Sequence, residues 1–470
     1  FLDNMGNLLG SPITEKETHI GTTPDGLSFG VSSMQGWRIH MEDAHICQPH
    51  LYAEEIVSDA PSTSSAPPAT AGETGEMMAI THKKKEYTQI SIPGHSLYAV
   101  FDGHGGSFAA EYAGRNMCRV ISRQLGFVEY GKWVQARPTT EPTMTDDKEK
   151  EKYIRGGLAL LEGSLRDAFI QIDREIMREV QGFGNEDANM HYGKNYDGEV
   201  GGAAAPPGTP GMGDTHSDVK GVATDPTADH PRPNHEEDSG TTAIVVIVTP
   251  DWIVCANAGD SRAVYSKDGH RAIALSYDHK PDDEYEERRI KDAGGYVSHG
   301  RVEGDLAVSR GLGDFRFKDI DTVLWGIRQR SDSTLRKPED QKVSPVPDII
   351  VNSRDATLDE FIVLACDGIW DVATNQECVK SVADIFNEGE SDLGLISEEV
   401  LDECLIRGSK DNMTTLVVKF NAQQIGEGGG VKARRELKEA ATAAQEAIAR
   451  SKGMTGGGSG DNGPNSQMFS

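Results

Sequence analysis

The sequence predicts an α+β protein in which antiparallel β-sheets are covered by α-helices. The strand-like segments are short, rich in Val and Ile, and bounded by Gly, Asp or Asn. They follow one another in runs and do not alternate strictly with the helical segments. Strict alternation would indicate a doubly wound parallel sheet, so the runs of strands favour antiparallel sheets.

Each element is predicted from its residue pattern. Strand patterns occur at Leu27–Ser33, Leu97–Phe101, Ala243–Thr249, Trp252–Ala256, Ala263–Ser266, Phe361–Ala365 and Thr414–Phe420. Helical periodicity marks Phe108–Leu125, Leu158–Val180, Asp282–Ala293, Gln376–Phe386 and Glu398–Ile406. No internal repeat is visible.

Low-complexity stretches interrupt these elements. They are rich in Ser, Ala, Pro, Thr or acidic residues, and the longest contains the string APPGTPGMG. Such a composition buries too little apolar surface to offset the entropy of ordering the chain, so we expect mobile loops; small folded subdomains are the less favoured alternative. The predicted organisation is an N-terminal segment (1–25), one domain (26–422) with flexible insertions at 54–92, 127–152 and 181–238, and a helical, low-complexity tail (423–470).

Charge and cysteine content restrict the partners. The 470 residues include 47 basic and 75 acidic ones, giving a formal net charge of −28 and a pI near 4.9. Such a surface repels phosphate backbones and anionic lipids, which disfavours nucleic-acid and membrane partners, and it suits multivalent cations. The six cysteines form no C-x-x-C pair, which favours a reducing compartment over a disulfide framework or a zinc site.

The targeting signals point to a soluble protein. No apolar run reaches the length of a membrane span, and no signal-peptide core is visible. Gly6 follows Met5, but the N-myristoylation pattern needs Ser or Thr at residue 10, where the chain has Gly10. A lipid at Gly6 is therefore less favoured than an unmodified segment. We expect an intracellular monomer in the cytoplasm, the nucleus or both.

Acidic residues recur at the ends of the predicted strands: Glu42, Asp43, Asp102, Asp260, Asp367, Asp371 and Asp411. A single Asp-Gly pair is better explained as a turn, since it is a common hairpin dipeptide. The whole set is not explained that way, because an unpaired carboxylate at the end of a buried strand such as FIVLAC is costly. Clustered carboxylates without matching Arg or Lys indicate a hard cation, Mg²⁺ or Mn²⁺.

A carboxylate at a strand end could bridge two such ions. A two-metal site lowers the pKa of a bridging water and clamps an in-line displacement at phosphorus. Arg38 could hold phosphate oxygens bidentately, although taken alone it is better explained as a surface ion pair with Glu42 four residues on. His104, in FDGHGG, is by itself better explained as a turn histidine.

Nine strings occur in an order that resembles the type-2C family of metal-dependent Ser/Thr protein phosphatases. They are SSMQGWRIHMEDAH, VFDGHGG, SGTTA, NAGDSRA, DHKP, GGYVSHGRVEGDLAVSRGLGDF, VSPVPDI, LACDGIWDV and GSKDNMTTLVV. Each short motif is weak alone, but the ordered set is specific, and it spans roughly Gly26 to Phe420 once the insertions are set aside.

The resemblance implies a fold and an activity. The fold is a four-layer αββα sandwich of two antiparallel sheets flanked by helices, with residues 26–422 as the catalytic domain. The activity is hydrolysis of phosphoserine and phosphothreonine in proteins, by direct attack of water activated by two Mg²⁺ or Mn²⁺ ions and without a phosphoenzyme. A hydrolase of small phosphoesters or nucleic acid is disfavoured by the net charge. The alternative is a catalytically inactive, phosphatase-like scaffold, which would predict a missing acidic ligand; none is missing.

The resemblance also implies which residues bind the first two ions. Asp102 would bridge both ions, and Gly103 would contribute its carbonyl oxygen. Asp367 and Asp411 would complete the shell of the first ion. Glu42, through water, would serve the second, with the next residue along the chain in support. The full set matched to metal-binding positions is Glu42, Asp43, Asp102, Gly103, Asp260, Asp367, Asp371 and Asp411.

The remaining roles follow from the same resemblance. Asp260 and Asp371 match positions associated with a weaker third ion. Arg38 would hold the substrate phosphate, and His104 would protonate the leaving serine or threonine oxygen. The segment Asp278–Gly304 resembles the variable flap beside the active site, and Arg301 within it is a candidate for substrate contact.

Overall fold

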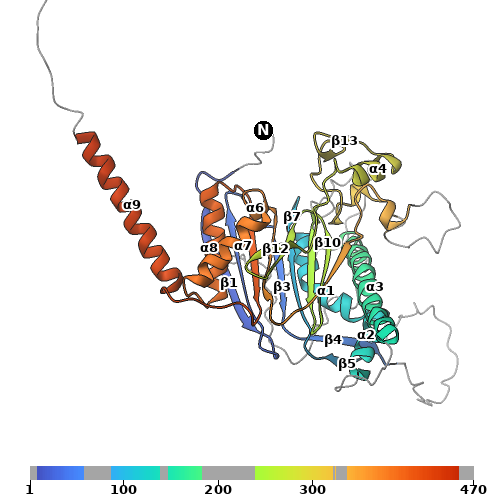
Figure 1. The fold of residues 1–470 in the computed structure, drawn as a ribbon. Helices are drawn as coiled ribbons and strands as arrows, with labels where there is room; N and C mark the ends of the chain where they lie inside the picture. Colours follow the sequence, from blue (N-terminus) through green and yellow to red (C-terminus); the bar gives the residue numbers. More distant parts are fainter. Residues whose placement is uncertain are drawn as a thin grey trace, which may run out of the picture.

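A computed structural model describes residues 8–57, 86–137, 147–182, 239–320, 323 and 336–454. It confirms the predicted α+β class and the four-layer arrangement: two β-sheets pack face to face between two layers of helices (Figure 1). The site predicted from the sequence lies at one end of these sheets.

The two sheets are antiparallel throughout. In sheet order, the six-stranded one contains β1 (Ile13–Thr22), β2 (Ser28–Gly36), β18 (Met413–Lys419), β17 (Asp359–Ala365), β11 (Arg262–Lys267) and β12 (Arg271–Ala274). The five-stranded one contains β16 (Asp348–Ser353), β10 (Trp252–Ala258), β9 (Ala243–Val248), β6 (Ser96–Phe101) and β3 (Ala44–Gln48).

Helices cover the outer face of each sheet. The five-stranded sheet packs against α1 (Phe108–Ser122), α2 (Leu125–Ala136) and α3 (Asp147–Val180). The six-stranded sheet packs against α7 (Asn375–Asn387) and α8 (Leu393–Arg407). A third hydrophobic cluster fills the space between the sheets. Central strands are therefore apolar on both faces.

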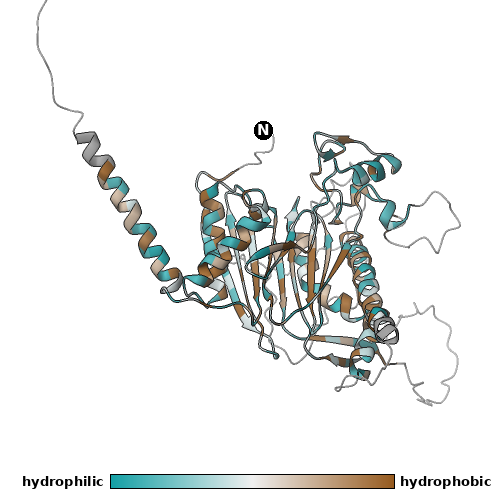
Figure 2. Cartoon of the chain, in the orientation of Figure 1, coloured by the Kyte–Doolittle hydropathy of each residue, from teal (hydrophilic) through white to brown (hydrophobic). Residues whose placement is uncertain are grey.

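Strand β9 shows why these strands appear as unbroken apolar runs. Along AIVVIV, Val245 and Ile247 face the helices, whereas Ile244 and Val246 face the other sheet. Because both faces are buried, the usual alternation of apolar and polar residues is absent. Figure 2 shows hydrophobic residues concentrated in the strands between the helical layers, while the region around α4 is mostly hydrophilic.

Smaller elements gather at the end of the sandwich that carries the site. A short three-stranded sheet contains β7 (Gly103–His104), β8 (Gly240–Thr241) and β15 (Leu312–Gly313), and α6 (Asp367–Trp370) follows β17. The flap and the residues after it contain α4 (Glu284–Asp292), β13 (Val297–Ser298), β14 (Arg301–Val302), η2 (Phe315–Phe317) and η4 (Pro338–Asp340).

The predicted organisation needs three corrections. Strand β1 pairs with β2, so the segment 1–25 contributes a strand to the sandwich. The predicted flexible insertion 54–92 has ordered ends, because β4 (Leu51–Ile56) pairs with β5 (Tyr87–Ile92). The insertion 127–152 overlaps α2 and the start of α3. Within these insertions residues 58–85, 138–146 and 183–238 lie outside the described residues, as does Gly6.

The tail contains the predicted helix, α9 (Gly430–Met454), which projects from the sandwich (Figure 1). Its first turns contact α7 and α8, where Val431 is buried and Arg434 pairs with Glu388. None of the helices in the described part of the chain has the length and hydrophobicity needed to cross a membrane.

Candidate active site

Strand register brings the predicted acidic residues to one end of the sandwich. Ala44 pairs with Phe101 across β3 and β6, so Asp43 and Asp102 leave the five-stranded sheet side by side. Ala365 pairs with Thr415 across β17 and β18, which brings the segments around Asp367 and Asp411 together in the other sheet. The remaining acidic residues lie in adjoining loops: Glu42 before β3, Asp260 between β10 and β11, and Asp371 after α6.

Carboxylates from both sheets converge. Asp102, Asp260 and Asp367 each offer an oxygen within 4.8 Å of the others. Burial raises the pKa of Asp102 and of Asp367 well above the usual range, and the neighbouring carboxylates raise both further. Among the described residues, neither of these two side chains has a hydrogen bond or ion pair with Arg or Lys. A cation bound here would stabilise the ionised forms of Asp102 and Asp367.

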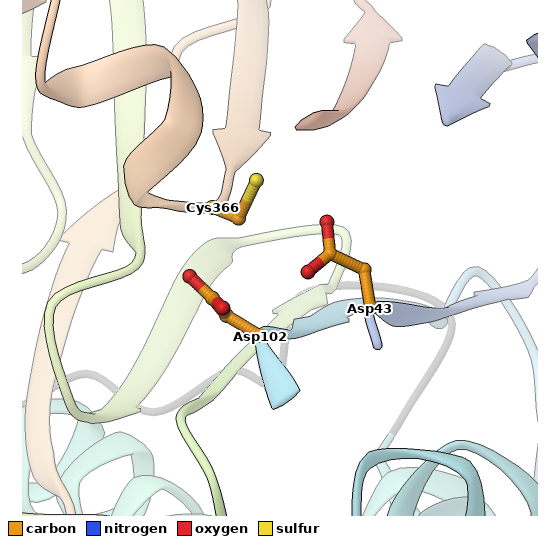
Figure 3. Close-up of side chains that lie close together, drawn as sticks. All are labelled: Asp43, Asp102 and Cys366. Carbon is orange, nitrogen blue, oxygen red and sulfur yellow. The ribbon is translucent and has the colours of Figure 1, made fainter. Parts of the chain in front are cut away.

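A second group contains Asp43, Asp102 and Cys366, which converge from three different segments (Figure 3). Asp43 is buried; its Oδ2 accepts a 2.7 Å hydrogen bond from Thr414 Oγ1, while its Oδ1 has no hydrogen-bond partner among the described residues. Burial raises the pKa of Asp43 to about 7. The pKa of the Cys366 thiol is also raised by burial, and Cys366 Sγ receives the backbone N–H of Thr414 at 3.1 Å. Cys366 therefore orders this corner as a neutral thiol.

The donor set fits a hard divalent cation. In the part of the chain that the structure describes, carboxylate oxygens outnumber the cationic groups at the site, Asp43 Oδ1 lacks a hydrogen-bond partner, and the nearby Cys366 thiol is protonated. Mg²⁺ and Mn²⁺ prefer such oxygen ligands, whereas a soft metal would select a thiolate. Binding of a cation would also remove the repulsion that raises these pKa values.

Gly103 is required by a close backbone approach. A Cβ atom at residue 103 would lie 2.2 Å from the carbonyl oxygen of Glu42. The next segment is fixed as well, because the Glu42 N–H donates to Asn412 Oδ1 at 2.9 Å, and Asn412 Nδ2 donates to the carbonyls of Gln35 and His40. Asn412 thus holds the loop that carries Arg38 and Glu42 against the strand that follows Asp411.

Arg38 lies at the rim of the carboxylate cluster. Its guanidinium pairs with Asp411 and not with Glu42, which is the partner that the helical spacing suggested. The Arg38 side chain is 44% exposed, so it stays open to solvent and to a ligand. The pKa of Glu42 is raised, with burial as the largest cause.

His104 directly follows Gly103 in the chain. Its side chain contacts Asp314, a residue that the sequence analysis did not single out. Its Nε2 lies 2.9 Å from both carboxylate oxygens of Asp314. Burial lowers the pKa of His104, but the charge of Asp314 and its hydrogen bond outweigh this effect, and the net shift is upward. Asp314 stands in the quoted string GLGDF, although nothing in that string indicates its partner.

Asp260, one of the two residues matched to a weaker third ion, pairs with a lysine. Lys280 Nζ, from the string DHKP, lies 2.5 Å from Asp260 Oδ2, and Asp260 is buried. Asp371 keeps part of its surface in solvent, and its pKa is raised because the protein around its carboxyl partly desolvates it and because Asp260 adds negative charge. Arg301 is not brought into the cluster: its guanidinium donates to the backbone carbonyl of Asp305, within the flap and the loop that follows it.

Comparisons with known proteins identify the family. A model of the family described as protein phosphatase 2C matches residues 215–413. Protein phosphatase 1B of Mus musculus is 31% identical over 454 residues, which cover 96% of this chain and 85% of that protein. The chain belongs to the protein phosphatase 2C family.

Other relatives and solved structures agree. Protein phosphatase ppm-1.A of Caenorhabditis elegans is 32% identical over 419 residues, covering 89% of this chain, and this chain spans 64% of its length. This chain likewise spans 62% of protein phosphatase 2C homolog 2 of Saccharomyces cerevisiae. A solved serine-threonine phosphatase 2C from Toxoplasma gondii superposes with a TM-score of 0.50 at 17% identity, over 86% of this chain and 99% of that one, and shares its fold.

Proposed function

We propose that the protein is a metal-dependent phosphatase that hydrolyses phosphoserine and phosphothreonine in protein substrates. The observation that carries this proposal is the convergence of the Asp102, Asp260 and Asp367 carboxylates. Among the described residues, no Arg or Lys pairs with Asp102 or Asp367, and the pKa values of both are raised. Membership of the protein phosphatase 2C family supports it, as do relatives named protein phosphatases.

The proposal assigns residues of this end of the sandwich to two divalent cations. Asp102 would serve both ions, with the Gly103 carbonyl, Asp367 and Asp411 on one side and Glu42 on the other. Asp43 would support them, and Asp260 and Asp371 would hold a weaker third ion. When bound, Mg²⁺ or Mn²⁺ supplies Lewis-acid polarisation of the phosphate and lowers the pKa of water to the range where hydroxide forms.

The chain's own side chains would bind the substrate and move a proton. Arg38, at the rim, would leave Asp411 and hold phosphate oxygens with its planar fork of N–H groups. His104, whose side chain is 30% exposed, would give a proton to the serine or threonine oxygen as the bond to phosphorus breaks. Arg301 in the flap would contact residues around the phosphorylated side chain.

The test is hydrolysis of a phosphothreonine peptide with Mn²⁺, with and without EDTA, for the parent and for Asp102→Ala. We expect activity that requires the metal and is lost in the variant. A matched control is Asp268→Asn, which changes an exposed turn aspartate. Activity that survives chelation, or that Asp102→Ala leaves unchanged, would contradict the proposal.

A further inference from the structure

The contact between His104 and Asp314 joins residues 210 positions apart. Both oxygens of Asp314 lie 2.9 Å from Nε2, so that one end of the imidazole faces a carboxylate squarely. The Asp314 side chain is 3% exposed and that of His104 is 30% exposed. One ring nitrogen is thus held inside the protein, and Nδ1 has no hydrogen-bond partner among the residues that the structure describes.

Backbone pairing builds this contact. Across the three-stranded sheet, His104 pairs with Gly240, and Gly240 pairs with Gly313. Asp314 follows immediately in a left-handed conformation (φ +52°), which turns its carboxylate back over Gly240. A Cβ atom at residue 240 would lie 2.2 Å from Asp314 Oδ2, so glycine at this position makes room for the carboxylate.

A buried ion pair anchors the segment that carries Asp314. Lys318 Nζ lies 2.8 Å from Asp173 Oδ1, and their side chains are 0% and 2% exposed. The same Asp173 oxygen accepts the Gly313 N–H at 2.8 Å, and Lys318 Nζ donates to the Gly311 carbonyl at 2.9 Å. A buried charged pair of this kind fixes geometry even where its net contribution to stability is small. Helix α3, which carries Asp173, therefore sets the position of the backbone next to Asp314.

We propose that Asp314 is the positioning residue of His104: it accepts the Nε2 hydrogen, fixes the ring plane, and leaves Nδ1 as the nitrogen that serves the leaving oxygen. The inference deepens the proposed function and rests on it. In the step concerned, the proton on Nδ1 passes to the serine or threonine oxygen as its bond to phosphorus breaks. The ring is left neutral, with its remaining proton on Nε2 and held by Asp314.

Leaving-group dependence tests the proposal, because a proton donor matters most for a poor leaving group. For Asp314→Ala we expect kcat/KM to fall about 10²-fold with a phosphothreonine peptide and only about threefold with p-nitrophenyl phosphate. Asp314→Asn retains an oxygen that can accept the Nε2 hydrogen, so it should restore a large part of the loss. The matched control is Asp268→Asn, an exposed aspartate with a similar left-handed backbone (φ +58°), which should leave both rates unchanged.

A double-mutant cycle separates positioning from general damage. If Asp314 acts through His104, Asp314→Ala should cost nothing further in a His104→Ala background. Equal losses on both substrates, or a full additional loss in that background, would overturn the proposal while leaving the proposed phosphatase function standing.

A readout without catalysis distinguishes failure of the inference from failure of the proposed function. Ring-nitrogen ¹⁵N shifts of His104, assigned with His104→Gln, should show Nε2 protonated in the parent and a mixture of tautomers in Asp314→Ala. If the parent hydrolyses neither substrate with Mn²⁺, the proposed function fails and these shifts still decide the contact. Identical ¹⁵N shifts in the parent and Asp314→Ala would overturn it.

Discussion

The carboxylates of Asp102 and Asp367 in the active site face other carboxylates, whereas the buried carboxylate of Glu286 at the base of the flap faces two arginines. Glu286 Oε2 lies 2.5 Å from Arg289 Nη1, and Oε1 lies 2.7 Å from Arg310 Nη2. These three side chains are 3–9% exposed. Asp348, which pairs with Arg310, supplies a second carboxylate, so that two negative charges face two positive ones.

The pKa values record the difference. The two arginines and a hydrogen bond from Ser309 outweigh the burial of Glu286 and lower its pKa to about 2. In the active site burial and like charges act together, and the pKa values of Asp102 and Asp367 rise. A buried charge that is paired indicates a structural role, and a buried cluster of like charges indicates a functional site. The flap cluster joins α4 to β16 through Arg310 and Asp348.

The largest expected effect is on activity, and it comes from removing the carboxylate of Asp367, which lies among other carboxylates. Asp367→Asn should lower Mn²⁺-dependent kcat/KM about 10³-fold, because one of the carboxylates that would hold the cations is lost, and with it the charge stabilisation that a bound cation gives the reacting phosphate. The same variant should unfold at equal or higher urea concentration in EDTA, since one repelled carboxylate is gone. Asp268→Asn, at the exposed turn between β11 and β12, is the control and should change neither value. A variant that loses stability in EDTA would mean that Asp367 is held by structural contacts.

Removing the paired charge of Glu286 should lower stability, in contrast to removing the charge of Asp367. Glu286→Gln leaves Arg289 and Arg310 without their shared carboxylate, and the free energy of unfolding should fall by about 3 kcal/mol in urea denaturation. Glu284→Gln on the same helix is the control, because Glu284 is 91% exposed and its pair with Arg288 contributes little. Equal effects of the two substitutions would remove the distinction between the two regions.

The same cluster gives a pH dependence with a defined sign. Because the pKa of Glu286 is lowered in the folded state, its contribution is complete above the unfolded value near 4.5. It is lost progressively as the pH falls from there toward 2. The parent should therefore lose stability over this interval, measured by urea unfolding at each pH, and Glu286→Gln should lose less. Parallel pH profiles for the two proteins would contradict the assignment.

The elements that could be predicted from the sequence are those that a local residue pattern determines. Strands such as β9 and β17 were predictable because both faces are buried and the apolar run is continuous. Strand β1, ITEKETHIGT, is an edge strand with many exposed residues, so its sequence carries no such pattern. The hairpin of β4 and β5 was missed because its strands are separated by a long stretch of low complexity.

The site divides in a similar way. Asp102 and Asp367 could be singled out because each follows an apolar strand directly, which makes a charge there unusual. Asp314 and Lys280 could not, because their significance depends on contacts with His104 and Asp260 that only the folded chain creates. Arg38 pairs with Asp411, which is 373 residues away in the chain, and not with the nearby Glu42 that the sequence suggested. Local sequence shows which groups are out of place, and only the fold shows which groups they meet.

The smallest expected effect lies on α9, where paired charges are partly exposed to water. Arg434 Nε lies 2.7 Å from Glu388 Oε2, with side chains 17% and 41% exposed. Solvent screens such pairs, so Arg434→Ala should lower the free energy of unfolding by less than about 1 kcal/mol. Lys432→Ala, an exposed neighbour on the same helix, is the control for helix propensity. A loss near that of Glu286→Gln would show that pairing of the charge, and not its burial, determines how much a charge cluster stabilises this protein.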